Sequence, residues 1–278
     1  MPLEPGQIQV RDLVMDDGTT TPYMVLSFNP WNRQIRASGE GENPWGHGGY
    51  SGAEWLDIAV VNMDIHVIGV SDSDWMTKQF ALMQAFAPVE TGPDVELRWM
   101  VGDTEYMMRG RPRMLNPTVR NIQSGEITSS ASFVCLDPLI YSGELHEAPL
   151  GLPRWSGGLA VPVEVPVSLD AELSDGVTTI TNAGMRTARV LLRFDGPVSR
   201  PAVTLAGATL ALDLDIPAGH WVDVDTLDRT VLYDGHISRL QDARGSWPVL
   251  PPGSHELRFT ARRFDPDAAL TVRWRDTY

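Results

Sequence analysis

Cysteine is nearly absent from this sequence of 278 residues, in which Cys135 is the only one. A single cysteine excludes an intrachain disulfide framework and a metal site built from several cysteines. Because Cys135 stands in the apolar segment 131–136, we expect a small buried hydrophobic side chain and not an activated nucleophile. This cysteine usage indicates a protein that folds in a reducing cytoplasm.

Long apolar stretches and positive charge are also scarce. No stretch approaches the roughly 20 consecutive apolar residues that cross a bilayer. Residues 1–6 (MPLEPG) lack the positive and apolar segments of a secretory signal. Asp and Glu number 36 against 22 Lys and Arg, which gives a net charge of −14. Nucleic-acid-binding proteins use clustered Lys and Arg, so we expect neither membrane insertion nor stable nucleic-acid binding.

Glycine and proline are frequent by contrast, with 25 and 21 residues spread along the chain. This pattern is typical of many short strands joined by tight turns. The length suits two domains, and after residue 142 the composition shifts to a segment rich in Gly and Pro. We therefore predict a mainly β protein: an N-terminal β-sandwich-like domain over residues 1–143, a linker over 144–165 and a C-terminal antiparallel β-sandwich over 166–278.

One helix interrupts the β pattern. We predict it over residues 73–87, because Ser and Asp residues at 71–74 can cap its start and Pro88 follows its end. Apolar residues recur within it at spacings of three and four. They are Trp75, Met76, Phe80, Met83, Phe86 and Ala87. We expect this stripe to pack on a sheet, with Lys78 and Gln84 on the opposite face.

A segment rich in glycine and aromatic residues, 39–52, follows the first predicted strands. Four glycines and a proline fall within nine of its residues, so we expect no regular element there. Trp45, His47 and Tyr50 on such a loop suit contacts to a neighbouring subunit or a partner protein, because aromatic side chains dominate the energetics of interfaces. The alternative is a loop that folds back onto its own domain.

Nine tryptophans are many for this length and raise a carbohydrate-binding hypothesis, because exposed indoles stack on sugar rings. The candidates in the C-terminal half are Trp155, Trp221, Trp247 and Trp274. Trp274 shares the phase of apolar strand residues and is expected in the core. Trp221 is out of phase with Val222 and Val224, so it is the candidate for carbohydrate contact. Packing in a core or an interface is the alternative.

No arrangement of residues predicts catalysis or a cofactor. Two Asp-x-Asp pairs, at 213 and 215 and at 223 and 225, carry oxygen ligands of the kind that calcium binds. Alternation within a strand places both members of a pair on the solvent face, and we favour that interpretation. The six histidines show no helical metal spacing, and no Gly-x-Ser-x-Gly motif is present. We therefore expect no enzymatic activity, no cofactor and no metal site.

Several motifs, taken in their order and spacing, resemble one known family. In the C-terminal half they are TITNAG (179–184), FDGPV (194–198), IPAGHWVDVDT (216–226), RTVLYDG (229–235), WPVLPPGSH (247–255), LTVRWR (270–275) and the final Tyr278. In the N-terminal half they are RGRPR (109–113) and FVCLDPLIYS (133–142). Together they resemble the distal tail proteins, also called minor tail proteins, of long-tailed phages that infect actinobacteria.

The resemblance implies a structural component of the virion at the phage tail tip, synthesised in the cytoplasm of the host bacterium. It implies an N-terminal domain that assembles into a homo-hexameric ring and a galectin-like or carbohydrate-module-like C-terminal sandwich on the outside of that ring. Such a ring joins the tail tube protein to the tip hub, or tail-associated protein, and supports receptor-binding proteins. DNA passes through its lumen without stable binding, which acidic side chains would favour.

Two other functions stay open. A carbohydrate-binding adhesin module that contacts host glycans would share the sandwich and the tryptophans without needing a ring. A cell-wall glycosidase would need paired carboxylates in one cleft, which no motif identifies.

Overall fold

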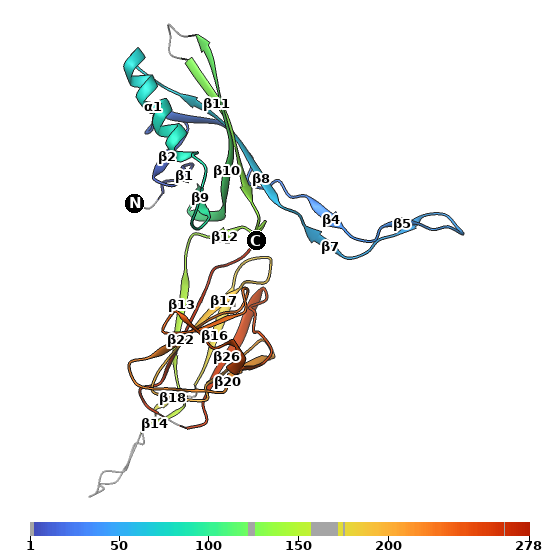
Figure 1. Ribbon diagram of the computed structural model, residues 1–278, viewed down its shortest axis with the longest axis vertical. Coiled ribbons are helices and arrows are strands. Elements are labelled where there is room, and N and C mark those ends of the chain that lie inside the picture. Colours follow the sequence, from blue (N-terminus) through green and yellow to red (C-terminus); the bar gives the residue numbers. More distant parts are fainter. Residues whose placement is uncertain (1–2, 122–125, 157–171, 175, 264) are drawn as a thin grey trace, which may run out of the picture. The chain divides into compact units, whose positions relative to one another are not determined.

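The computed structural model describes residues 3–121, 126–156, 172–174, 176–263 and 265–278. They form two compact units, Met1–Gly143 and Glu144–Tyr278, called unit 1 and unit 2 below. Strands dominate both units, and the described residues contain a single α-helix, α1 (Asp72–Ala85) (Figure 1). The mainly β fold class predicted from the sequence is therefore confirmed.

The strands of unit 1 build one large antiparallel sheet and a separate hairpin. They are β1 (Ile8–Val10), β2 (Leu13–Met15), β3 (Tyr23–Phe28), β4 (Ile35–Ala37), β5 (Gly41–Glu42), β6 (Gly49–Tyr50), β7 (Glu54–Leu56), β8 (Ala59–Val67), β9 (Val95–Val101), β10 (Thr104–Asn121), β11 (Glu126–Cys135) and β12 (Tyr141–Ser142). The large sheet has the order β2-β1-β9-β10-β11-β8-β3, and β12 also pairs with β10.

Strand β10 connects the two halves of this sheet, because its first part pairs with β9 and its second part with β11. The partner changes next to Gly110, where a Cβ atom would lie 2.3 Å from the carbonyl oxygen of Val134. The register shifts between Pro112 and Met114. A bulge bends the strand that carries it, so the sheet can curl around a single core.

That core is built by alternation along the central strands. On β8 the buried side chains are Ala59, Val61, Met63, Ile65 and Val67, every second residue. On the adjacent β11, Phe133 and Cys135 are fully buried, which confirms the expectation for the cysteine. Burial raises the pKa of the Cys135 thiol to about 12, so it is protonated at neutral pH and a poor nucleophile.

Helix α1 starts one residue earlier and ends two residues earlier than predicted. The Ser71 side chain accepts from the Asp74 amide, and the Asp74 carboxylate accepts from the amide of Val70 (3.0 Å), a reciprocal cap that sets the start. The end is set by Arg11 in the turn between β1 and β2. Its guanidinium donates to the carbonyl oxygens of Gln84 (2.7 Å) and Ala87 (2.8 Å). A positive charge at this C-terminal end of the helix interacts favourably with the helix dipole.

The predicted packing face of α1 was partly wrong. Trp75 and Phe86 are buried as expected, but Leu82 and Gln79 complete the buried face. Gln79 is accommodated by a hydrogen bond to the buried Ser129 on β11 (3.4 Å). Three of the residues expected in the core are exposed instead: Met76, Phe80 and Met83.

Unit 2 is an antiparallel β-sandwich, as predicted. Its strands are β13 (His146–Gly151), β14 (Arg154–Ser156), β15 (Glu172–Ser174), β16 (Val177–Asn182), β17 (Val190–Asp195), β18 (Val198–Ser199), β19 (Ala202–Leu205), β20 (Ala208–Leu212), β21 (Asp215–Ile216), β22 (Trp221–Asp225), β23 (Thr230–Tyr233), β24 (Ile237–Ser238), β25 (Ala243–Gly245), β26 (Gly253–Thr260) and β27 (Ala269–Trp274), with a 3-10 turn, η1, at Leu240–Asp242. One sheet has the order β13-β27-β17-β22-β23-β24 and the other β16-β26-β19-β20-β25. Their inward side chains, including Phe194, Phe259 and Leu270, form one buried cluster.

Part of the predicted linker belongs to this sandwich. Residues 146–151 form β13, which pairs along its whole length with the last strand, β27, from His146 opposite Trp274 to Gly151 opposite Ala269. The Gly and Pro content of this segment led us to predict a linker instead of a strand. Strand β13 lies at the edge of the sheet, where proline is tolerated. Residues 157–165 of the predicted linker lie outside the described residues. Within the part of the chain that the structure describes, no helix is both long enough and apolar enough to span a bilayer.

Candidate functional site

The segment from β4 to β7, residues 35–56, forms a two-stranded ribbon that we call the arm. Strand β4 pairs with β7 from Ile35 opposite Leu56 to Ala37 opposite Glu54, and farther out Gly41 pairs with Tyr50 and Glu42 with Gly49. In Figure 1 the arm leaves unit 1 as a narrow extension on the side away from α1. The prediction that 39–52 holds no regular element was therefore wrong, and the segment does not fold back onto its own domain.

The glycines that argued against a strand are what let the ribbon form. At the tip, the Asn43 amide donates to the Gly48 carbonyl (2.9 Å), and Gly48 has a φ of +89°, which favours glycine. Farther along, a Cβ atom on Gly52 would lie 1.5 Å from the carbonyl oxygen of Ser38. The two chains of the arm can approach this closely only because position 52 has no side chain.

The three residues predicted as contact residues all lie on the outer half of the arm. Trp45 is in the tip turn and is 95% exposed, and His47 beside it is also exposed. Tyr50 on β6 is exposed, and its hydroxyl end lies across Gly41 on the opposite strand. An isolated two-stranded ribbon is only marginally stable in water. Contact with a partner that covered the exposed indole would therefore stabilise the arm.

The base of the arm is tied to the sheet by aromatic packing. Trp31, just before β4, packs edge-on against Trp99 and Tyr106 with ring centroids 5.8 and 5.3 Å apart. Trp99 is buried on β9. Next to it, the Arg33 guanidinium donates to the carbonyl oxygen of Pro30 at 2.8 Å. The direction in which the arm leaves unit 1 is therefore set at its base.

A second exposed apolar surface lies on α1. Met76, Phe80 and Met83 are spaced at i, i+4 and i+7 and therefore share one side of the helix; we call them the helix stripe. Phe80 is 60% exposed and both methionines are exposed. The sequence analysis identified these residues as apolar and periodic but assigned them to the core. Nothing in the sequence distinguishes them from Trp75 and Leu82, because both sets follow a helical spacing.

The candidate carbohydrate residue, Trp221, lies on the outer face of β22, with Val222 and Val224 buried on the other side. It is half-buried. The Arg193 guanidinium lies over its ring, and its indole N–H donates to the Asp223 carboxylate at 2.9 Å. Trp274, which the sequence analysis expected in the core, is buried, and its indole N–H donates to the carbonyl oxygen of Thr181. The side chain of Trp155 lies outside the described residues.

The paired aspartates do not converge on a common point. Asp213 pairs with Arg200 (3.1 Å), Asp215 accepts from Ser199 (2.6 Å) and Asp225 lies 3.5 Å from Arg189. Each carboxylate thus has a partner of its own. Among the described residues, no group of three or more His, Cys, Asp or Glu side chains is arranged to hold a metal ion.

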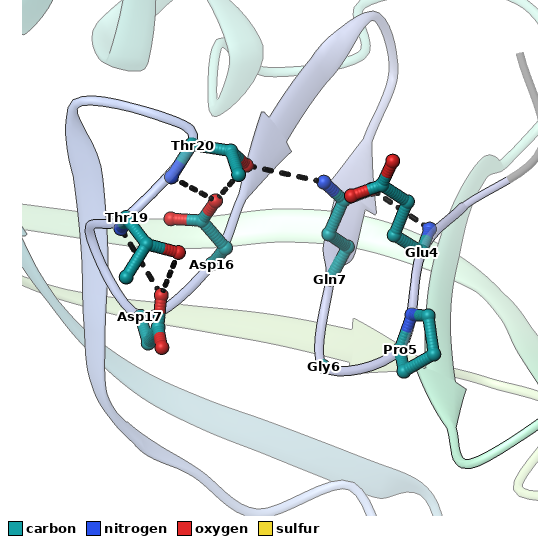
Figure 2. A pocket seen from close by; sticks show the side chains of 8 residues that line it. All are labelled: Glu4, Pro5, Gly6, Gln7, Asp16, Asp17, Thr19 and Thr20. Atoms are coloured by element: carbon teal, nitrogen blue, oxygen red, sulfur yellow. Dashed lines mark hydrogen bonds between the residues drawn. The ribbon is translucent and has the colours of Figure 1, made fainter.

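A small polar pocket beside β1 and β2 is organised by Asp16 (Figure 2). Its buried carboxylate accepts hydrogen bonds from the amides of Gly18 (2.7 Å), Thr20 (3.1 Å) and Thr21 (3.0 Å), and from both threonine hydroxyls. Burial by itself would raise the pKa of Asp16, but these hydrogen bonds outweigh it and hold the pKa below its ordinary value. The carboxylate therefore fixes the loop before β3 and has little capacity left for a ligand.

Comparisons with known proteins add a fold relationship. No protein-family model and no curated protein matches the sequence. Among solved structures, the Dit protein of phage SPP1 aligns over 98% of this chain and 98% of its own, with a TM-score of 0.65 and 14% identical residues. The chain has the fold of a phage distal tail protein. The likeness confirms, at the level of the fold, the resemblance drawn from the sequence motifs.

Two phage baseplate chains share this fold more distantly. A chain of the phage P2 baseplate in its activated conformation with calcium aligns over 96% of this chain and 97% of its own, with a TM-score of 0.53 and 8% identity. The corresponding strontium form gives 96% of both chains, a TM-score of 0.52 and 9% identity. The SPP1 protein is described as a paradigm of the hub adsorption apparatus of phages that infect Gram-positive bacteria. In all three cases the match runs through both units.

Proposed function

We propose that this protein is a non-enzymatic structural subunit of a phage tail tip, where it forms a ring between the tail tube and the tip hub. The distal tail fold, matched over 98% of the chain, is the observation that carries this proposal. The ring consists of six copies, and its outer surface supports receptor-binding proteins. The protein is part of the virion, and it is made in the cytoplasm of the host bacterium.

The exposed surfaces of unit 1 support an assembly role. The ribbon carries a 95% exposed indole at its tip. Exposed apolar side chains clustered on such a projection favour association with another protein surface. Trp45, His47 and Tyr50 contact a neighbouring subunit or another tail protein in this proposal. Aromatic side chains of this kind often supply most of the binding free energy of an interface.

The net charge of −14 fits the same role. Electrostatic repulsion between acidic side chains and phosphates disfavours lasting contact with DNA that passes through a ring. Binding of the chain to duplex DNA should therefore be undetectable at physiological salt.

A carbohydrate-binding adhesin has less support. Sugar stacking needs a free face on an indole, whereas Arg193 covers one face of Trp221 and Asp223 engages its N–H group. Among the tryptophan side chains that the structure describes, the exposed ones are Trp31, Trp45 and Trp55, which lie on the arm or at its base in unit 1.

The proposal is tested by measuring the mass of the purified chain by light scattering, alone and with the tail tube protein of the same phage, together with negative-stain images. We expect closed rings with a mass of six subunits. A chain that stays monomeric in both conditions would contradict the proposed function.

A further inference from the structure

The arm tip and the helix stripe are two exposed apolar surfaces of the same unit. Between Asn43 and Tyr50 the only ionisable side chain besides the tyrosine is His47. Of the polar residues near the stripe, Thr77 and Gln84 are uncharged and Lys78 is paired with Asp74 at 2.7 Å, whereas Asp72, one turn before Met76, is acidic. Covering the arm tip therefore removes apolar groups from water without stripping water from a carboxylate, an ammonium or a guanidinium group.

The two surfaces are also complementary in form. The stripe runs over seven residues of helix, about 10 Å at 1.5 Å per residue, with Phe80 between two methionines. Methionine side chains adapt to the shape of a partner and make favourable contacts with aromatic rings. The arm tip presents Trp45 in a turn that also holds Gly46 and Gly48, and the indole is almost fully exposed, so its ring can pack on another surface.

The arm of a chain points away from that chain's own helix, as Figure 1 shows for unit 1. An arm can therefore reach a helix stripe only on another copy. A contact between two different surfaces of identical chains is heterologous, and repeating it generates a ring when the rotation closes. This gives each subunit one donor surface and one acceptor surface.

We propose that the arm tip of one copy packs on the helix stripe of the next, with Trp45 seated against Met76, Phe80 and Met83. This inference rests on the proposed ring and names its subunit contact. The aromatic pair and the two methionines form the apolar centre of the interface, and the rest of the arm adds the polar rim that such interfaces have.

Two single variants separate the donor from the acceptor surface. Trp45→Ser disables the arm and leaves the stripe intact, whereas Phe80→Ser disables the stripe and leaves the arm intact. Each alone should fail to form rings. An equimolar mixture should form a dimer with one chain of each kind and nothing larger, since only one matching pair of surfaces remains; native mass spectrometry resolves its composition. Met185→Ser, at an exposed methionine in unit 2, is the control and should assemble like the unmodified chain.

Disulfide trapping tests the same contact without requiring stable rings. A chain with Trp45→Cys is mixed with one carrying Phe80→Cys, at high concentration and under mild oxidation. We expect a covalent dimer that joins positions 45 and 80. The native Cys135 is fully buried and does not compete. Met185→Cys replaces Phe80→Cys in the control mixture and should give no dimer with the arm variant beyond background.

The possible outcomes separate the two proposals. Rings that persist in Phe80→Ser, or a mixture of the two serine variants that stays monomeric, would overturn the arm-to-stripe contact and leave the ring itself standing. A 45–80 dimer that forms while the unmodified chain remains monomeric supports the contact and places closure of the ring on another tail component. Absence of both rings and the trapped dimer would overturn both proposals.

Discussion

The guanidinium of Arg193 lies over the indole of Trp221, with its central carbon 4.5 Å from the ring centroid. Arg193 is itself held by Asp195 at 3.1 Å, and the indole N–H group is held by Asp223. The half-buried Trp221 is thus already engaged on one face and at its polar edge. A sugar that stacked on that face would first have to displace the arginine.

We therefore expect no carbohydrate affinity that depends on Trp221. Glycan-array screening, followed by calorimetry at sugar concentrations up to about 1 mM, should give the same background signal for the unmodified chain and for Trp221→Ala. The control is Trp247→Ala, which removes an indole packed against the core of the same unit. Binding that is lost in Trp221→Ala alone would restore the adhesin hypothesis.

Gly52→Ala should disrupt the arm and leave the rest of the chain intact. The added Cβ would lie 1.5 Å from the Ser38 carbonyl oxygen, so the ribbon cannot close there. Hydrogen exchange should become fast across residues 35–56, and ring formation should be lost. The melting temperature should change by less than about 2 °C, because the arm contributes little to either core.

The matched control for the arm is Gly46→Ala at the tip. Its Cβ would meet only the flexible side-chain amide of Asn43, at 3.3 Å. This variant should keep both slow exchange in the ribbon and ring formation. Equal behaviour of the two glycine variants would show that the ribbon geometry does not matter for assembly.

Arg11→Ala should destabilise unit 1 by about 1–2 kcal/mol, since it removes two charge-assisted hydrogen bonds and a favourable charge from the end of α1. Arg11 also has a φ of +54°, so Arg11→Gly separates the two contributions. Glycine relieves the backbone strain and should recover part of the loss. Urea denaturation measures both, with the exposed Arg113→Ala as the control expected to stay within about 0.5 kcal/mol.

Asp16→Asn should destabilise the chain by about 1–3 kcal/mol at pH 7, because an amide cannot accept all the hydrogen bonds that the carboxylate accepts. The pKa of Asp16 is lowered in the folded state. Its contribution is therefore fully present above the unfolded value of about 3.9 and is lost as the pH falls through the lower folded value. The gap between the unmodified chain and the variant should be constant above about pH 5 and shrink below pH 4.

Denaturation of both proteins across pH 2–8 checks this dependence on Asp16. The exposed turn residue Asp103 provides the matched control, Asp103→Asn, which should show little loss at any pH. A gap for Asp16→Asn that stayed the same at pH 2.5 and pH 7 would contradict the assigned role of the carboxylate.

Much of the sandwich was predictable because its strands follow a period of two. Val222 and Val224 are buried and Trp221 faces outward, as alternation requires. Cys135 was predicted to be buried from its apolar neighbours. Strand β13 was missed because it contains Pro149 and ends at Gly151; only its pairing with β27, more than a hundred residues later, makes it a strand.

The amino-acid sequence by itself determined the β class, the single helix, the core side of the alternating strands and the aromatic content of segment 39–52. These properties follow from local periodicity and composition. Only the tertiary structure decided that Phe80 faces water while Gln79 is buried, and that Trp45 stands at the end of a ribbon. Such outcomes depend on which surfaces a helix or hairpin finds opposite it, as Gln79 finds Ser129. They arise from residues distant in the chain, which local periodicity does not encode.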